Sequence, residues 1–155
     1  MSQLKIGDSA PSFKGVDQDG NLIELGQFMG QKVVLYFYPK DDTPGCTAQA
    51  CNLRDNLASL KSHGIEVIGV SIDSVKSHTK FVTKFELNFP LVSDENKEIV
   101  EAYGVWGLKK FMGKEYMGTN RTTFIIDEKG IVEGIISKPK TKTHAEEILS
   151  LLKLN

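Results

Sequence analysis

The sequence is poor in cysteine and has no long apolar run. Only 2 of its 155 residues are cysteines, too few for a secreted disulfide framework and too few for a structural zinc site, which needs four Cys or His ligands. No stretch is long enough to cross a membrane, and the N-terminus lacks the apolar core of a signal peptide. We therefore expect a cytoplasmic protein, where a close cysteine pair is more often catalytic or redox-sensing than structural.

An excess of either charge is also absent. The formal net charge is −1, with 19 basic and 20 acidic residues, and the lysines are scattered, so neither a nucleic acid nor a membrane surface is an expected partner. The three histidines lack metal-ligand spacing and are predicted to be solvated helix residues: His63, His78 and His144. Asp41 and Asp42 are predicted to be solvated loop carboxylates, because nothing near them indicates burial.

The length fits one domain, 1–155, large enough to bury its own core. Apolar patterns and turn signals in its first half predict a regular succession of elements. These are two short strands in 11–24 around the turn Asp19-Gly20-Asn21, a helical turn in 25–30, a buried strand at 33–37, a helix at 44–63 closed by Gly64, and a strand at 65–72.

The second half continues in the same way. Its predicted elements are a helix to about Leu87 capped by Asp73 or Ser74, a strand at 89–92, a helix from Ser93-Asp94 to Tyr103, a packed loop at 104–118 near the active face, a hairpin of strands 122–127 and 131–136, and a last helix opened by a capping box of Thr143 and Glu146. Crossovers come first and a hairpin late, which predicts a mixed central sheet with helices on both faces. We predict an α/β protein with a thioredoxin-like fold and an added N-terminal β-hairpin.

Both cysteines lie in 39–51, where the predicted central strand leads into a helix. With Thr43 as N-cap and Pro44 as the first helical residue, Cys46 falls in the first turn. Free backbone NH groups and the helix dipole stabilise a thiolate there, although the two preceding aspartates oppose it, so a cation must come from elsewhere in the fold. The alternative is that Cys46 is a small buried hydrophobic residue.

Helix geometry separates the two cysteines. Cys46 lies on the apolar stripe of the helix, and Cys51 lies about 140° around it, with the two Cα atoms about 8.6 Å apart. A disulfide needs a Cα separation below about 7 Å, so pairing requires the first helical turns to unwind. The spacing predicts a sulfenic acid on Cys46 that Cys51 later resolves. The alternative is that Cys51 is an incidental cysteine on a helix flank.

This cysteine corner resembles the active site of peroxiredoxins. Pro39-x-x-x-Thr43-x-x-Cys46 matches the general motif, and Thr43-Pro-Gly-Cys-Thr with Cys51 five residues on is similar to the bacterioferritin comigratory protein, or peroxiredoxin Q, branch. The resemblance covers nearly the whole chain. It extends to the stretches Tyr103-Gly-Val-Trp-Gly, Tyr116-Met-Gly and Arg121-Thr-Thr-Phe-Ile-Ile-Asp.

The resemblance implies a role for each residue of the motif. Cys46 would be the peroxidatic thiolate, and Cys51 the resolving cysteine. Thr43 would hydrogen-bond the sulfur or the bound peroxide, while Pro39 would shield the pocket from water. Arg121 would supply the missing cation, a role that its spacing alone could not have indicated.

The resemblance also implies partners. The substrate would be a hydroperoxide, the reductant thioredoxin or a glutaredoxin-like dithiol protein, and the protein a monomer without metal or organic cofactor. Gln49 departs from the pattern, because this branch usually has Glu there, and any role of that carboxylate in charge balance is absent here. Two other functions stay open: a disulfide reductase, which would need Cys-x-x-Cys, and a redox-responsive binding module that exposes Leu53 and Leu57 when the helix unwinds.

Overall fold

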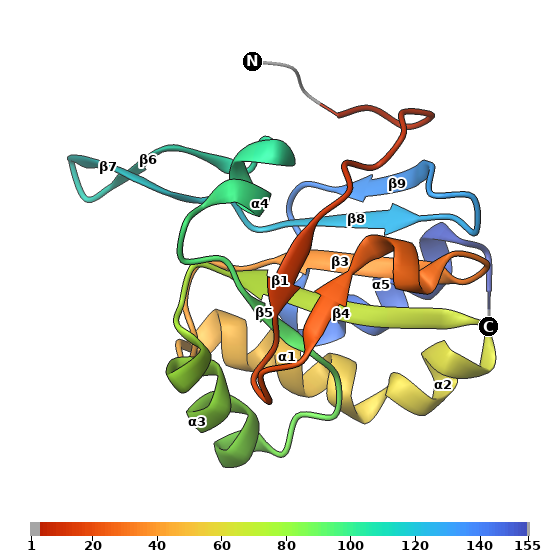
Figure 1. The fold of residues 1–155 in the computed structure, drawn as a ribbon. Helices are drawn as coiled ribbons and strands as arrows, with labels where there is room; N and C mark the ends of the chain where they lie inside the picture. Colours follow the sequence, from red (N-terminus) through yellow and green to blue (C-terminus); the bar gives the residue numbers. More distant parts are fainter. Residues whose placement is uncertain (1–3, 155) are drawn as a thin grey trace.

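The computed structural model describes residues 4–154 (Figure 1). The prediction that the N-terminal stretch lacks a signal-peptide core falls in part on residues 1–3, which lie outside the described residues. Its strands are β1 Lys14–Val16, β2 Leu22–Glu24, β3 Lys32–Phe37, β4 Ile65–Ser71, β5 Leu91–Ser93, β6 Trp106–Phe111, β7 Lys114–Thr119, β8 Thr122–Ile126 and β9 Val132–Ile136. Its α-helices are α1 Pro44–Asp55, α2 Leu57–Ser62, α3 Val75–Phe85, α4 Glu98–Ala102 and α5 His144–Leu151, and its 3-10 turns are η1 Leu25–Phe28 and η2 Thr141–Thr143. Among these residues, no helix is both long and apolar enough to cross a bilayer.

Seven strands form one mixed sheet in the order β2-β1-β5-β4-β3-β8-β9. β3 and β4 are parallel, as are β4 and β5, whereas β8 pairs antiparallel with both β3 and β9. The predicted N-terminal hairpin is present as β1 and β2, and it joins the sheet because β1 pairs antiparallel with β5. The thioredoxin-like α/β fold with a mixed sheet is confirmed.

The alternation of β3 builds a core on each face of the sheet. Val34 and Tyr36 pack with apolar side chains of α1, α2, α3 and α5, while Val33, Leu35 and Phe37 pack with α4 and the N-terminal segment. All five side chains are at most 1% exposed, and each such burial contributes about 1.5–3 kcal/mol. The predicted placement of helices on both faces is therefore confirmed, with α4 alone among the α-helices on the second face (Figure 1).

The helix predicted at 44–63 is in fact two helices with a break at Asn56. The Asn56 side chain donates to the carbonyl of Asn52 at 2.8 Å, and its backbone leaves helical geometry with φ −109° and ψ 8°. An asparagine that bonds the preceding turn competes with the helical ladder, which accounts for the break. Gly64 follows α2 with φ +73°, as expected for a residue that ends a helix.

The prediction of a helix starting at Ser93-Asp94 is wrong by one turn. α4 begins only at Glu98, after Lys97 in a left-handed conformation with φ 64°. The Asp94 carboxylate nevertheless accepts hydrogen bonds from the backbone NH groups of Ile99 and Val100. Asp94 therefore caps α4 although it lies four residues before the first residue of the helix. Burial raises the pKa of the Asp94 carboxyl group, and the backbone hydrogen bonds partly offset that rise.

The packed loop predicted at 104–118 is also wrong. These residues form β6 and β7, a separate two-stranded sheet that projects from the body of the molecule (Figure 1). Its turn places Met112 at φ 50° and Gly113 at φ 79°, and a methionine in that conformation gives no turn signal in the sequence. Val105 before β6 is buried, but Met112, Tyr116 and Met117, which also indicated packing, are exposed.

The predicted capping box of α5 does not form, because Thr143 makes no side-chain cap bond. Instead, Asn52 of α1 accepts from the backbone NH of Ala145 at 2.7 Å and donates to the carbonyl of Lys142 at 3.0 Å. One side chain from a different helix thus satisfies both sides of the η2–α5 junction. This tertiary cap fixes the second half of α1 to the beginning of α5.

Candidate active site

Cys46 lies where the central strand gives way to α1. β3 ends at Phe37, Thr43 follows with an extended backbone as N-cap, and Pro44 is the first helical residue. The Cys46 side chain is 1% exposed. The predicted position in the first helical turn is therefore observed, where unpaired NH groups and the helix dipole favour negative charge.

Arg121 lies beside this sulfur although 75 residues separate the two in sequence. Its Nη2 donates to Cys46 Sγ at 3.2 Å, and its Nη1 donates to Gln49 Oε1 at 2.7 Å. β8 pairs antiparallel with β3, with Thr122 opposite Phe37, which carries the residue before β8 to the end of β3. The cation that the sequence required from elsewhere is thus supplied by sheet topology.

Gly45 leaves room for this guanidinium. A Cβ built on Gly45 would lie 3.2 Å from Arg121 Nη2, tighter than an ordinary van der Waals contact. A larger residue between Pro44 and Cys46 would push the guanidinium away from the sulfur. This close approach explains why the Thr-Pro-Gly-Cys stretch has a glycine between Pro44 and Cys46.

Gln49 holds the guanidinium without neutralising it. Its side chain is fully buried, its Oε1 accepts from Arg121, and its Nε2 is without a partner among the described residues. The oxygen must face Arg121, because the guanidinium has only donors to offer. A carboxylate at this position would cancel part of the positive charge that reaches Cys46, and the amide leaves it intact.

Thr43 does not bond the sulfur in this structure. Its hydroxyl donates to the carbonyl of Lys40 at 2.9 Å and makes no cap bond. Pro39, directly after the buried Tyr38, is partly buried. Both residues thus lie on the loop between β3 and α1, and the Thr43 hydroxyl would have to rotate to meet a ligand near Cys46.

Two more side chains near the thiol were not found from the sequence. Tyr36 is fully buried, and its pKa is raised well above the usual value of 10, first by burial and then by negative charge on Cys46. Lys109 of β6 donates to the carbonyl of Thr119 at 3.0 Å, and burial together with the charge of Arg121 lowers its pKa. Lys109 is therefore a second cation near the site, contributed by the projecting hairpin, and no spacing signal indicates it.

Cys51 lies on the same helix as Cys46 and is partly buried, and both thiols are free. α1 is continuous from Pro44 to Asp55. Ideal helical geometry therefore applies, and it places the Cα atoms of Cys46 and Cys51 about 8.6 Å apart. In this conformation the two sulfurs belong to one intact helix. Its first turns would have to open for a disulfide to form.

The predictions for several polar residues are wrong. Asp41 is 7% exposed and not solvated, and His78 and His144 are fully buried. His144 lies between Thr123 Oγ1 at 2.8 Å and Glu147 Oε1 at 2.9 Å. Tertiary packing far from these residues in sequence buries them, and a single polar residue gives no sign of that. By contrast, Asp42 is exposed as predicted.

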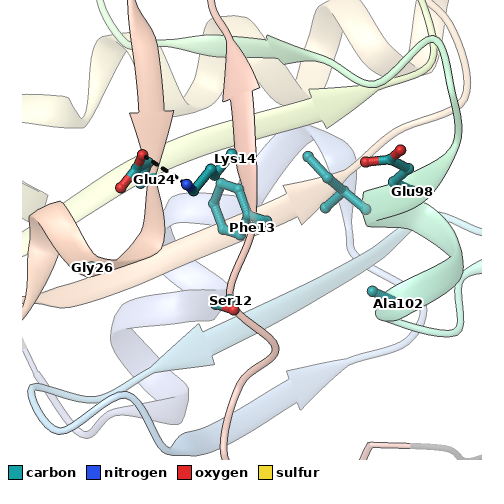
Figure 2. Close-up of a pocket in the computed structure, with 8 residues that line it drawn as sticks. Ser12, Phe13, Lys14, Glu24, Gly26, Glu98 and Ala102 are labelled. Atoms are coloured by element: carbon teal, nitrogen blue, oxygen red, sulfur yellow. Dashed lines mark ion pairs between the residues drawn. The ribbon is translucent and has the colours of Figure 1, made fainter.

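A separate open pocket of about 440 Å³ lies on the face of the sheet opposite Cys46. Figure 2 shows Lys14 and Glu24 on its wall, joined by an ion pair of 3.9 Å, with Glu98 across from them. None of the site residues predicted from the sequence lines it. The chemistry of the cysteine corner does not involve this pocket.

The chain matches a protein-family model and known proteins over most of its length. The AhpC/TSA family model matches residues 6–135. Over 153 residues the chain is 48% identical to peroxiredoxin Bcp of Escherichia coli K12. The aligned region covers 99% of this chain and 98% of that protein. It is 44% identical over 150 residues to peroxiredoxin Bcp of Bacillus subtilis, with 97% and 96% covered.

Solved structures show the same likeness. A PrxQ mutant from Xylella fastidiosa matches with a TM-score of 0.92 and 33% identity, covering 99% of this chain and 98% of that one. A Xanthomonas campestris bacterioferritin comigratory protein, studied for alkyl peroxide reduction in trapped intermediate and ligand complexes, matches with a TM-score of 0.85 and 36% identity over 91% and 90% of the two chains.

Proposed function

The chain belongs to the AhpC/TSA family of thiol-dependent peroxidases, and we propose that it reduces hydrogen peroxide and organic hydroperoxides through Cys46. One observation carries the proposal: the Arg121 guanidinium lies 3.2 Å from a buried sulfur in the first turn of a helix. Two independent sources of positive potential meet at that sulfur, and both favour the thiolate, which is the reactive form.

In the first step, the Cys46 thiolate attacks one oxygen of the peroxide, and the oxygen–oxygen bond breaks. The sulfur becomes a sulfenic acid, and the other oxygen takes a proton from solvent and leaves as water or an alcohol. Arg121 stabilises the negative charge that develops on oxygen, and the Thr43 hydroxyl donates to the peroxide after rotating away from Lys40. Pro39 covers the pocket and restricts the entry of water.

In the second step, the Cys51 thiol attacks the sulfenic sulfur, water leaves, and an intramolecular disulfide forms. α1 must open for this step, because its helical geometry holds the cysteines too far apart. Thioredoxin or a glutaredoxin-like dithiol protein then reduces the disulfide by exchange. A single-domain cytoplasmic monomer spanning 1–155 completes the proposal, with no metal or organic cofactor.

Intact-mass spectrometry after one equivalent of hydrogen peroxide tests both steps. The wild type is expected to lose two hydrogens as the disulfide forms, and Cys51→Ser to gain one oxygen that a sulfenic acid reagent traps at Cys46. Cys46→Ser should neither react nor consume peroxide with a thioredoxin system. Unimpaired peroxide consumption by Cys46→Ser would contradict the assignment.

An insulin-reduction assay separates the peroxidase from a disulfide reductase. The chain has Cys-x4-Cys instead of Cys-x-x-Cys, so we expect no insulin reduction above that of Cys46→Ser. Slow peroxide oxidation accompanied by altered partner binding would instead favour the redox-responsive module. That outcome would need Leu53 and Leu57, which are at most 5% exposed here, to become accessible on oxidation.

A further inference from the structure

We propose that a buried pair, Asp41 and His78, holds the beginning of α1 folded, and so divides the Cys46 sulfenic acid between resolution by Cys51 and over-oxidation. The inference rests on the proposed function, because it needs a sulfenic acid at Cys46. It assigns a role in positioning to two residues that the cysteine motif does not specify, since neither is observed to contact the sulfur.

The Asp41 carboxylate is the centre of the contact. Its Oδ1 accepts from Tyr38 Oη at 2.6 Å, and its Oδ2 accepts from Ser77 Oγ at 2.8 Å and lies 2.6 Å from His78 Nδ1. The Asp41 backbone NH donates to Asp73 Oδ2 at 2.8 Å. The loop between β3 and α1 is therefore tied by side chain and main chain alike to α3 and the segment before it.

Both ring nitrogens of His78 are hydrogen-bonded. Nε2 lies 3.1 Å from the carbonyl of Val92, which can only accept, so Nε2 carries a proton, and Nδ1 shares a second proton with the Asp41 carboxyl group 2.6 Å away. Burial and the Asp41 charge raise the pKa of Tyr38 well above its usual value, so its hydroxyl remains a donor.

A metal ion is the competing explanation, because Asp41, Asp73 and His78 place three ligand-type atoms within 4.8 Å of one another. Two ligands of one tetrahedral zinc ion, each about 2.0 Å from the metal, lie about 3.3 Å apart. Asp41 Oδ2 and His78 Nδ1 are 2.6 Å apart, which is a hydrogen-bond distance. The geometry therefore fits a shared proton and not a shared ion.

The position of the pair in the chain connects it to the chemistry. Asp41 precedes Cys46 by five residues, and Asp42 between them has φ 56°, a left-handed conformation that costs energy in a residue other than glycine. The buried contacts of Asp41 hold the loop in that conformation. Their loss would favour opening of the loop and the first turn of α1.

The second half of α1 is held separately. Asn52, next to Cys51, bonds the η2–α5 junction through two neutral contacts, an exposed one to the carbonyl of Lys142 and a partly buried one to the backbone NH of Ala145. The Asp41–His78 pair therefore restrains the half that carries Cys46, and Asn52 restrains the half that carries Cys51. Opening the Cys46 half alone is enough to move one sulfur toward the other.

Two fates of the sulfenic acid then compete. Attack by Cys51 needs the open helix and gives the disulfide and water. Attack on a second hydroperoxide needs the folded pocket, and it gives a sulfinic acid on Cys46 and one more water or alcohol. A tighter Asp41–His78 pair slows the first reaction and so favours the second.

The test compares the double variant Asp41→Ala/His78→Leu, which leaves no unpaired buried charge, with Asp42→Asn as a matched control. Asp42 is the adjacent aspartate, and it is exposed and paired with Lys84 at 2.8 Å. Quenched-flow mass spectrometry gives the rates of sulfenic acid and disulfide formation. A peroxide titration gives the concentration at which half of Cys46 becomes sulfinic acid.

We expect the double variant to form the disulfide at least tenfold faster and to need correspondingly more peroxide for half over-oxidation, with sulfenic acid formation changed less than threefold. In Asp41→Asn the amide can donate to a neutral His78, so the disulfide rate and the peroxide concentration for half over-oxidation should stay close to those of the wild type. Ser77→Ala, which removes one donor, should show a smaller change in the same direction. Should the double variant not fold, this single variant still tests the inference.

A disulfide rate within twofold of the wild type in the folded double variant would overturn the inference, as would an equal change in Asp42→Asn. The failure of the proposed function is distinguishable. In that case the wild type itself would form neither the sulfenic acid nor the disulfide.

Discussion

Replacement of Arg121 by glutamine tests the electrostatics of the site most directly. Arg121→Gln removes the guanidinium that lies 3.2 Å from Cys46 Sγ and keeps a polar side chain of intermediate length. It also removes the partner of Gln49 Oε1. The helix N-terminus and Lys109 then remain as sources of positive potential at the thiolate.

The expected loss follows from the geometry. Two unit charges 3.2 Å apart at an effective dielectric constant of 20 interact by about 5 kcal/mol, an upper bound because both charges lose solvation. Hydrogen bonds to charged groups contribute about 1.5–3 kcal/mol net, which is the better guide for a partly buried arginine. At about 1.4 kcal/mol per factor of ten, we expect the reaction of Cys46 with peroxide to slow by roughly 10- to 150-fold.

The assay measures the second-order rate constant for sulfenic acid formation with hydrogen peroxide, in a Cys51→Ser background so that no disulfide follows. The control is Arg54→Gln, which removes the chain's other arginine. Arg54 lies on α1 and pairs with Asp55, so the control makes the same change in net charge. A rate within twofold of the wild type for Arg121→Gln, or equal losses in both variants, would refute the reasoning.

Three further expectations follow from the packing. Gly69→Ala should lower the free energy of unfolding by about 1–3 kcal/mol in urea titrations, because its Cβ would lie 2.7 Å from Leu91 and 2.9 Å from Tyr36. Unchanged stability would contradict the tight packing of these β5 and β3 side chains over Gly69 of β4. Burial lowers the pKa of His144 from its usual 6.5, although Glu147 opposes this, so the unfolded chain binds the proton first as the pH falls. Unfolding free energy should therefore decrease below about pH 6.5, by up to about 1.4 kcal/mol per unit, and His144→Gln should flatten that slope; an unaltered slope would remove His144 as its source. Leu108→Ser, at a side chain 58% exposed, should change stability by less than about 0.5 kcal/mol, and a larger loss would show that the projecting hairpin is packed in solution.

The strands of the seven-stranded sheet and the cysteine corner were predictable because local signals agree there. The β-branched and aromatic run at 33–37 indicated β3, the Asp-Gly turn indicated the first hairpin, and Thr43-Pro44 indicated the beginning of α1. In each case the residues that determine the structure lie close together in sequence. The resemblance to peroxiredoxins then located Arg121, which no local pattern could indicate.

Features that depend on distant partners were missed. Asn52 caps a helix about ninety residues away. The capping box predicted from Thr143 and Glu146 was therefore wrong. Asp41 packs against α3, which lies more than thirty residues further along the chain, and nothing in the sequence distinguishes His78 from a surface histidine. The hairpin of β6 and β7 was missed for another reason. Its exposed apolar side chains gave the sequence pattern of a packed loop.

The Asn52 contact makes the C-terminal helix a sensor of the state of α1. The backbone amide of Ala145 is covered only as long as the turn next to Cys51 presents Asn52 Oδ1 to it. If disulfide formation opens only the Cys46 half of α1, this amide keeps its acceptor and its exchange with solvent stays slow, whereas unwinding of the Cys51 half would accelerate it. Hydrogen exchange at Ala145 therefore distinguishes which half of α1 opens on oxidation, from a helix that contains neither cysteine.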